Sequence, residues 1–231
     1  MKAERPCVVA NFALTADGKI STRNRTPSRF TSAVDKARLQ EIRAGADAVM
    51  VGRGTLVVDR MSLGLSREDL RERRLDEGRT EAPLRVIVSN RGLLDPRAKV
   101  FRTGHVVPVV FSTTRMEEAV RRRLAPLCDL HLFEAGTVSL PAALAILRRD
   151  YGVRTLVCEG GSELFRSLVE LGVVDEMRIT LAPLIFGGMR APTLTGLPGD
   201  FLLRQADFRV VSIESEGGEC FLHLRRSSAL G

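Results

Sequence analysis

Residues 155–168 read TLVCEGGSELFRSL, a short apolar run that stops at two glycines and continues as an amphipathic pattern. The run at 155–158 has the length and composition of a buried β-strand, and a helix is expected from about Ser162 to Leu171. Glycines between a strand and a helix let the backbone approach a ligand closely, and the first amides of the helix can donate to a phosphate. A tight turn without a ligand uses glycines in the same way. The stretch therefore predicts an α/β fold and marks one strand end as a candidate phosphate site.

Outward from this stretch, strand-like and helix-like patterns alternate along the chain. Strands are expected at 8–13, 46–51, 84–88, 106–111, 130–133, 155–158 and 177–182. Helices are expected from Thr31 or Ser32 to Ala44, briefly after Gly52, at 66–77 with Ser66 and Asp69 as a capping pair, from Thr113 or Thr114 to Leu124, and at 139–149. Strands at 208–213 and 220–224 flank Glu216-Gly217-Gly218 as a hairpin. The order predicts a single α/β domain over 1–231, with a mostly parallel sheet, helices on both faces and a C-terminal antiparallel hairpin.

Composition is that of an ordinary globular protein, with 44% hydrophobic and 27% charged residues. Since no apolar stretch approaches about 18 residues, no membrane span is expected. The first residues run directly into a short strand and do not resemble a signal peptide. The cysteines lie apart from one another, which predicts buried, reduced thiols in a cytoplasmic protein; they are Cys7, Cys128, Cys158 and Cys220. Three scattered histidines have no metal-ligand spacing, so no metal is expected.

The net charge of +7 raises the question of nucleic acid as a partner. Only four of the 35 basic residues are lysines, and the arginine fork also suits small phosphate ligands. With no Trp and one Tyr, a stacking platform for single strands is poorly supplied, so a small anionic ligand is favoured. The runs at 121–123, 148–149 and 225–226 are expected on solvated faces. Arg67, Arg71 and Arg74 share one helical face, which flanks either an anionic substrate or nothing.

Three further strand ends carry residues suited to phosphate. Gly52-Arg53-Gly54-Thr55 repeats the pattern of glycines after a strand. Ser89-Asn90-Arg91-Gly92 combines a cation with hydroxyl and amide groups, which suits a ribose 2′-phosphate and favours NADPH over NADH. The loop Asp17–Ile20 with Ser28-Arg29 is the fourth end. Each segment has a plain turn as its alternative, and Arg43 at a helix end has the alternative of interacting with the helix dipole.

Motifs of hydrolases, metalloenzymes, P-loop proteins and zinc deaminases are absent from the sequence. Hydride transfer needs no protein nucleophile, because a cofactor carries that chemistry. A site of glycines, arginines and a few carboxylates is compatible with it.

Several segments, in order, resemble the reductase of riboflavin biosynthesis, the stand-alone form of the C-terminal domain of the bifunctional deaminase–reductase. Any one motif is modest, but the ordered set is specific and covers about residues 6–225. The segments are 11–20 (NFALTADGKI), 28–32 (SRFTS), 42–55 (IRAGADAVMVGRGT), 156–164 (LVCEGGSEL), 174–176 (VDE), 181–183 (LAP) and the pair 187–188 (GG).

This resemblance implies a fold similar to dihydrofolate reductase, a homodimer, and reduction of a phosphoribosylaminopyrimidine by NADPH, with hydride delivered to C1′ of the opened sugar. Cofactor contacts would fall on Ala13, Thr55, Asp59, Ser89, Asn90, Arg91, Val138, Gly160, Gly161, Ser162 and Glu163. The phosphorylated substrate would meet Ser28, Arg43, Leu63, Arg67 and Glu159, with the two arginines on its 5′-phosphate. Glu159 would orient the pyrimidine or the opening sugar, and no residue is assigned as catalytic acid or base.

The sequence departs from the family pattern at 59–63. Asp59-Arg60-Met61-Ser62-Leu63 keeps the first Asp and the Leu of Asp-Asp-Pro-x-Leu, and the basic residue expected after the Leu is displaced to Arg67. Two alternatives remain open. One is a reductase of the same fold with another pterin-like or pyrimidine substrate, and the other is a non-catalytic binder of nucleotides or nucleic acid.

Overall fold

The computed structural model describes residues 4–22, 30–59, 62–104, 106–196, 202 and 205–227, without the side chain of Asp59. Its contacts divide the chain into two compact units. The first unit comprises Met1–Pro6 and Gln40–Val157, and the second comprises Cys7–Leu39 and Cys158–Gly231. Among the described residues, no helix is long and apolar enough to cross a membrane.

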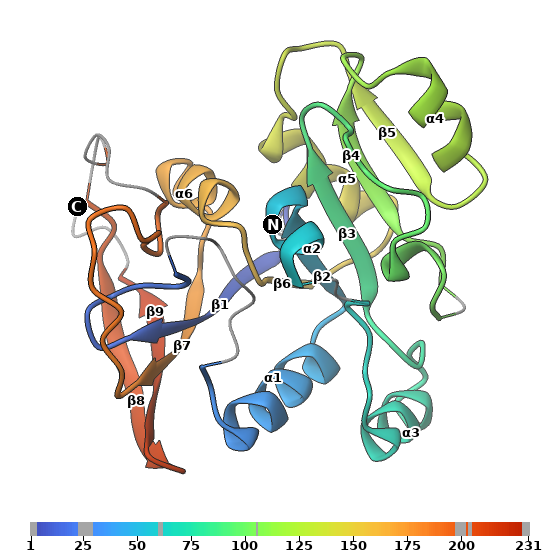
Figure 1. Cartoon of the computed structure of the whole chain (residues 1–231). Coiled ribbons are helices and arrows are strands. Elements are labelled where there is room, and N and C mark those ends of the chain that lie inside the picture. The colour runs from blue at the N-terminus through green and yellow to red at the C-terminus, as the bar shows by residue number, and fades with distance from the viewer. Residues whose placement is uncertain are drawn as a thin grey trace. The chain divides into compact units, whose positions relative to one another are not determined.

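The first unit contains a parallel arrangement of strands (Figure 1). The strands follow the hydrogen-bonded order β5-β4-β3-β2-β6, with bounds β2 Ala48–Gly52, β3 Leu84–Ser89, β4 Val109–Thr113, β5 Asp129–Phe133 and β6 Thr155–Cys158. Its helices are α2 Arg53–Asp59, α3 Glu68–Asp76, α4 Glu118–Leu124 and α5 Leu140–Arg149, with a 3₁₀ turn η1 at Lys99–Phe101. Ala48, Val49, Met50 and Val51 are all fully buried, as expected for a strand covered on both faces.

The second unit holds β1 Cys7–Thr15, β7 Glu176–Ala182, β8 Phe208–Glu216 and β9 Glu219–Arg226 in the order β1-β7-β9-β8, together with α6 Ser162–Glu170. β1 and β7 are parallel, whereas β9 is antiparallel to both β7 and β8. Helix α1 Ala33–Gly45 begins in this unit and ends in the first. The predicted α/β class, with mostly parallel strands and a C-terminal hairpin, is confirmed. The prediction of one domain over the whole chain stays a prediction.

Local sequence signals account for several helix ends. Ser32 Oγ accepts from the amides of Val34 and Asp35 at 3.1 and 3.2 Å, so Ser32 caps α1. Ser139 caps α5 by accepting from the Ala142 amide. After α5, Gly152 has φ +67°, a left-handed conformation that favours glycine, and the chain then turns into β6.

Some expected boundaries were wrong. The strand expected at 106–111 begins only at Val109, because Pro108 has no amide hydrogen to give to a strand ladder. The helix expected from Thr113 or Thr114 begins at Glu118, after a turn in which the Met116 amide donates to the Thr113 carbonyl. The expected capping pair Ser66 and Asp69 is not formed: α3 begins at Glu68, and Ser66 bonds to Gln40 instead.

The side chain of Arg74 is only 1% exposed, because backbone carbonyls bind its guanidinium. Some expectations about exposure were also wrong. Arg226 is half-buried, with a buried Nη1. Cys7 is exposed at the first position of β1, whereas Cys128 and Cys158 are buried as predicted. Arg121, Arg122 and Arg149 are exposed, as predicted.

Candidate active site

In the first unit, parallel strands bring the ends of β2, β3 and β4 to the same edge. Arg53, the first residue of α2, donates from Nε to the Leu93 carbonyl at 2.6 Å, which ties the segment after β2 to the loop after β3. Thr55 lies half-buried in the first turn of α2. The structure thus places two of the predicted phosphate segments side by side within one unit.

Asn90 connects that edge to the segment after β5. Its Oδ1 accepts from the Val138 amide at 2.9 Å, and its backbone carbonyl accepts from Thr113 Oγ1 at 2.6 Å. Next to it, the Ser89 carbonyl accepts from Ser112 Oγ at 2.7 Å. Because the Oδ1 atom of Asn90 already accepts the Val138 amide, a ligand contact from the Asn90 side chain would come from its NH₂ group. Ser89, Asn90 and Val138, three predicted cofactor residues, are therefore neighbours, and Arg91 follows them with an exposed side chain.

Arg43 and Leu63 are also joined in the first unit. Arg43, in the last turn of α1, is 6% exposed and donates from Nη1 to the Gly64 carbonyl at 3.0 Å. Leu63 is fully buried and has φ +60°, an unusual value for a residue with a side chain. The structure therefore places these two predicted substrate residues at one turn.

Arg67 lies four residues beyond Leu63 and is engaged by carboxylates. Its Nη1 is 2.8 Å from Glu41 Oε1, and it forms a two-pronged contact with Asp69. The hydrogen bond to Asp69 is the main cause that raises the pKa of Arg67. Glu41 also pairs with Arg73 at 3.1 Å. Sequence reasoning identified Arg67 but missed Glu41, since residues 26 apart give no helical spacing that would link them.

In the second unit, Glu159 is 9% exposed and directly precedes the paired glycines. Gly160 has φ +127°, and the Gly160–Gly161 peptide bond is cis. Gly161 is the residue before α6 and provides no side-chain acceptor for the first amides of that helix. Those amides therefore lack a side-chain cap, which is the arrangement that a bound anion can complete.

Helix α6 packs on β1 through Phe165 and Phe12, whose rings meet edge to face with centroids 4.9 Å apart. Ala13 follows Phe12 on β1 and is paired in register with Thr180 of β7. The structure thus fixes the predicted cofactor residues Ala13, Gly160, Gly161, Ser162 and Glu163 within the second unit. Ser28 lies outside the described residues, as does the side chain of Asp59.

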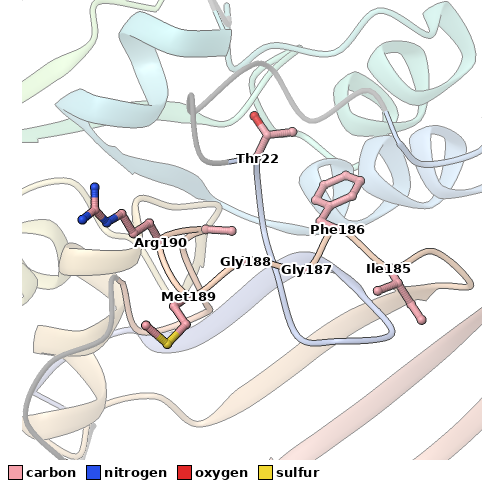
Figure 2. A pocket seen from close by; sticks show the side chains of 8 residues that line it. Thr22, Ile185, Phe186, Gly187, Gly188, Met189 and Arg190 are labelled. Carbon is pink, nitrogen blue, oxygen red and sulfur yellow. The ribbon is translucent and has the colours of Figure 1, made fainter.

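A pocket of about 440 Å³ in the second unit is lined by Thr22 and residues 185–191 (Figure 2). Figure 2 shows the Phe186 ring on the Thr22 side of this loop, with Ile185 and Met189 on the opposite side. Asp17 holds the loop: its carboxylate accepts from Thr15 Oγ1 at 2.6 Å and from the Gly187 amide at 2.7 Å. The Thr15 hydrogen bond is the main cause that lowers the pKa of Asp17. Sequence reasoning saw only a turn at Asp17-Gly18, because its partner lies 170 residues away.

No group of three or more His, Cys, Asp or Glu side chains suited to a metal occurs among the residues described. His131 is hydrogen-bonded to Tyr151 and His223 to Glu176. Within each unit, strand ends carry glycines or polar side chains of the class that binds phosphate-bearing nucleotides in α/β proteins.

Comparison with known proteins gives the particular family. The model of the RibD C-terminal domain matches residues 6–218. The 2,5-diamino-6-ribosylamino-4(3H)-pyrimidinone 5′-phosphate reductase of Archaeoglobus fulgidus is 35% identical over 92% of this chain and 94% of its own. The protein of the same name from Methanothermobacter thermautotrophicus is 32% identical over 98% of this chain and 94% of its own.

Among solved structures, a pyrimidine reductase-like protein from Corynebacterium diphtheriae superimposes with a TM-score of 0.83 at 20% identity, over 96% of this chain and 92% of its own. The chain belongs to the RibD C-terminal domain family, and its curated relatives above are reductases.

Proposed function

We propose that the protein reduces a ribosylaminopyrimidine 5′-phosphate to the ribitylamino product in riboflavin biosynthesis, with NADPH as cofactor. The observation that carries this proposal is the match to the RibD C-terminal domain over 6–218, supported by two full-length relatives named as 5′-phosphate reductases of a diamino-ribosylamino-pyrimidinone. The ordered arrangement of strand ends agrees with a nucleotide cofactor.

The residues present fit NADPH. The α6 amides that have no side-chain cap would bind the diphosphate, and the absence of side chains at Gly160 and Gly161 would let it approach the backbone. Arg91, exposed beyond β3, would pair with the 2′-phosphate, and Val138 would contact the adenosine end beside Asn90. Bound NADPH would supply the hydride for C1′ of the opened sugar.

The substrate would be oriented by Glu159, Arg43, Leu63 and Arg67, with Ser28 nearby by family pattern. Arg43, whose Nη1 donates to the Gly64 carbonyl, would bind the 5′-phosphate through its guanidinium. Arg67 would exchange Glu41 and Asp69 for that phosphate, since a dianion is a stronger partner for a guanidinium than an exposed carboxylate. Glu159, buried before the glycines, would accept from the pyrimidine or the opening sugar.

The direct test is oxidation of NADPH, followed by absorbance, with the diamino-pyrimidinone ribosylamino phosphate and with its deaminated counterpart. Turnover with either compound supports the proposal. Absence of turnover with both, in protein that binds NADPH, favours another pterin-like or pyrimidine substrate. Salt-dependent binding of nucleic acid without NADPH binding would instead indicate a non-catalytic binder.

We also propose that the active form is a homodimer in the cytoplasm. Val210, Val211 and Ile213 of β8, the last strand in the order of its unit, are 54%, 43% and 63% exposed. Exposed apolar side chains of this kind are often covered by a subunit contact. Sedimentation equilibrium should give twice the 25.4 kDa chain mass, and a monomer at assay concentration would refute the dimer.

A further inference from the structure

The buried guanidinium of Arg74 binds three backbone carbonyls of the first unit. Its Nη1 donates to the carbonyls of Ala44 at 2.7 Å and Ala46 at 2.6 Å, and its Nε donates to the carbonyl of Thr80 at 2.8 Å. Ala44 lies near the end of α1, Ala46 lies just before β2, and Thr80 follows α3. Arg74 therefore fixes the end of α1 against the segment that contains α3.

Arg43 is the direct neighbour of the backbone that Arg74 binds. Arg43 precedes Ala44, whose carbonyl Arg74 binds, and its own guanidinium donates to the Gly64 carbonyl. From the same segment, Leu65 and Leu70 pack with Ala44 in a buried cluster. Hydrogen bonds from Arg74 thus hold the backbone next to Arg43 to α3. Apolar contact through Leu65 holds the segment after the Leu63 turn to the same helix.

A second arginine reaches the same carbonyls. Arg79 donates from Nη1 to the Ala44 carbonyl at 3.1 Å, and its Nη2 contacts the Ala46 carbonyl and lies 3.1 Å from Asp47 Oδ1. Burial, followed by the charge of Arg79, lowers the pKa of Arg74 to about 10, so Arg74 remains protonated at neutral pH. Two cations at the end of α1 complement the partial negative charge of its last carbonyls. They also fix the direction of those carbonyls more rigidly than one donor would.

We propose that Arg74 is a positioning residue for the phosphate end of the substrate site, acting through Arg43 and the Leu63–Gly64 turn. The inference rests on the proposed function, since it takes Arg43 and Leu63 as substrate residues. Arg74 does not touch the substrate; it sets the backbone from which Arg43 reaches the 5′-phosphate.

Steady-state kinetics of Arg74→Met test this role. Loss of the guanidinium should raise the KM for the phosphorylated pyrimidine about tenfold, with kcat and the KM for NADPH within about twofold of wild type, because only ground-state placement of the phosphate is impaired. Arg74→Lys keeps a charged donor and should recover most of the change. Arg71→Met, on the same helix, is the matched control and should match wild type.

A double variant separates positioning from general damage. If Arg74 acts through Arg43, adding Arg74→Met to Arg43→Met should raise the KM by less than about twofold beyond Arg43→Met alone, since coupled residues are not additive. Should Arg74→Met fail to fold, Arg79→Gln carries the same test, because it removes the second guanidinium from these carbonyls while leaving Arg74 in place.

The outcomes are distinct. The inference is supported by three results together. Arg74→Met changes only the KM for the substrate, Arg74→Lys restores that KM, and the effect of Arg74→Met is not additive with that of Arg43→Met. Equal losses in kcat and in NADPH affinity, or additive effects with Arg43→Met, overturn it while leaving the proposed function intact. A wild-type protein that binds NADPH but does not turn over the phosphorylated pyrimidine refutes the proposed function, and the inference with it.

Discussion

Gly160 and Gly161 are adjacent, but they depend on the absence of a side chain for different reasons. Gly160 has φ +127°, a conformation that L-residues rarely adopt, so any substitution there strains the backbone. Gly161 has φ −73° and ψ 174°, an extended conformation open to any residue. A side chain at Gly161 therefore tests contact with a ligand, whereas one at Gly160 tests the fold.

Gly161→Val should weaken NADPH binding at least tenfold, about 1.4 kcal/mol, because a branched side chain would stand where the diphosphate approaches the backbone. Titration of NADPH by calorimetry measures the change. Gly160→Val is the comparison and should lower the thermal midpoint more than Gly161→Val does. An unchanged NADPH affinity in Gly161→Val would mean that the glycine pair serves the turn alone.

Arg91→Ala should raise the Kd of NADPH about tenfold while leaving the Kd of NADH within about twofold, since only NADPH carries the 2′-phosphate that the guanidinium would bind. Arg97→Ala is the control from the loop that follows, because Arg97 pairs with Asp95 at 3.0 Å. Equal losses for the two cofactors would remove the role in 2′-phosphate recognition that we assign to Arg91.

At the residue scale, the sequence offers candidate site residues but does not reveal which arginines are buried. The glycine pair and Ser89-Asn90-Arg91 were identified because their spacing after apolar runs is local. The buried arginines were not, because their partners are backbone carbonyls far along the chain. Arg74 bonds to residues 28 and 30 positions away, and Arg85 bonds to carbonyls of the loop at 100–106. Every residue carries a backbone carbonyl, so the pattern of side chains in the sequence does not indicate which carbonyl an arginine binds.

At the scale of elements, α1 depends on one hydroxyl at its start. Ser32 Oγ accepts from two amides of the first turn and donates to Glu219 Oε2 at 2.5 Å, and the Ser32 amide donates to Glu219 Oε1. Glu219 is only 4% exposed, so its carboxylate relies on these donors. The same side chain therefore caps a helix and satisfies a buried acid.

Ser32→Ala should lower the free energy of unfolding by about 1–2 kcal/mol, from the lost cap and one lost donor to Glu219. Urea denaturation followed by circular dichroism measures it. Thr31→Ala replaces the other residue that the sequence allowed as the cap, and it should stay within about 0.5 kcal/mol of wild type. The reverse ranking of the two variants would assign the cap to Thr31.

Element type was predictable from the continuous apolar run that contains most of β2 and from the amphipathic periodicity of α5 and α6. Boundaries failed where a single contact decided them. Ser66 had the composition of a cap for α3, but Gln40, 26 residues away, binds it instead. Helix α4 was expected from Thr113 or Thr114 but begins later, because a turn at 113–116 precedes it. That turn has no distinctive composition.

At the scale of the whole molecule, the four cysteines differ in burial. Burial raises the pKa of the Cys128 thiol to about 11 and that of Cys158 to about 12, so both remain thiols at neutral and mildly alkaline pH. Cys7 is exposed and Cys220 half-buried.

In native protein at pH 8, a thiol-specific alkylating reagent should label Cys7 first, Cys220 more slowly, and Cys128 and Cys158 only after denaturation. Peptide mass spectrometry at successive times reads out the order. Early labelling of Cys158 would contradict its burial beside Glu159, and would show that the strand end before the glycines opens in solution.

The segment at 64–82 has the composition of a dispensable surface insertion, charged and weakly patterned. A protein engineer who wished to shorten this chain would begin there. The carbonyls at 44 and 46 would then lose the donor that Arg74 supplies from within that insertion, and Ala44 would lose its apolar neighbours Leu65 and Leu70. A minimised version of this protein must therefore keep the insertion, or rebuild the end of α1 by other means.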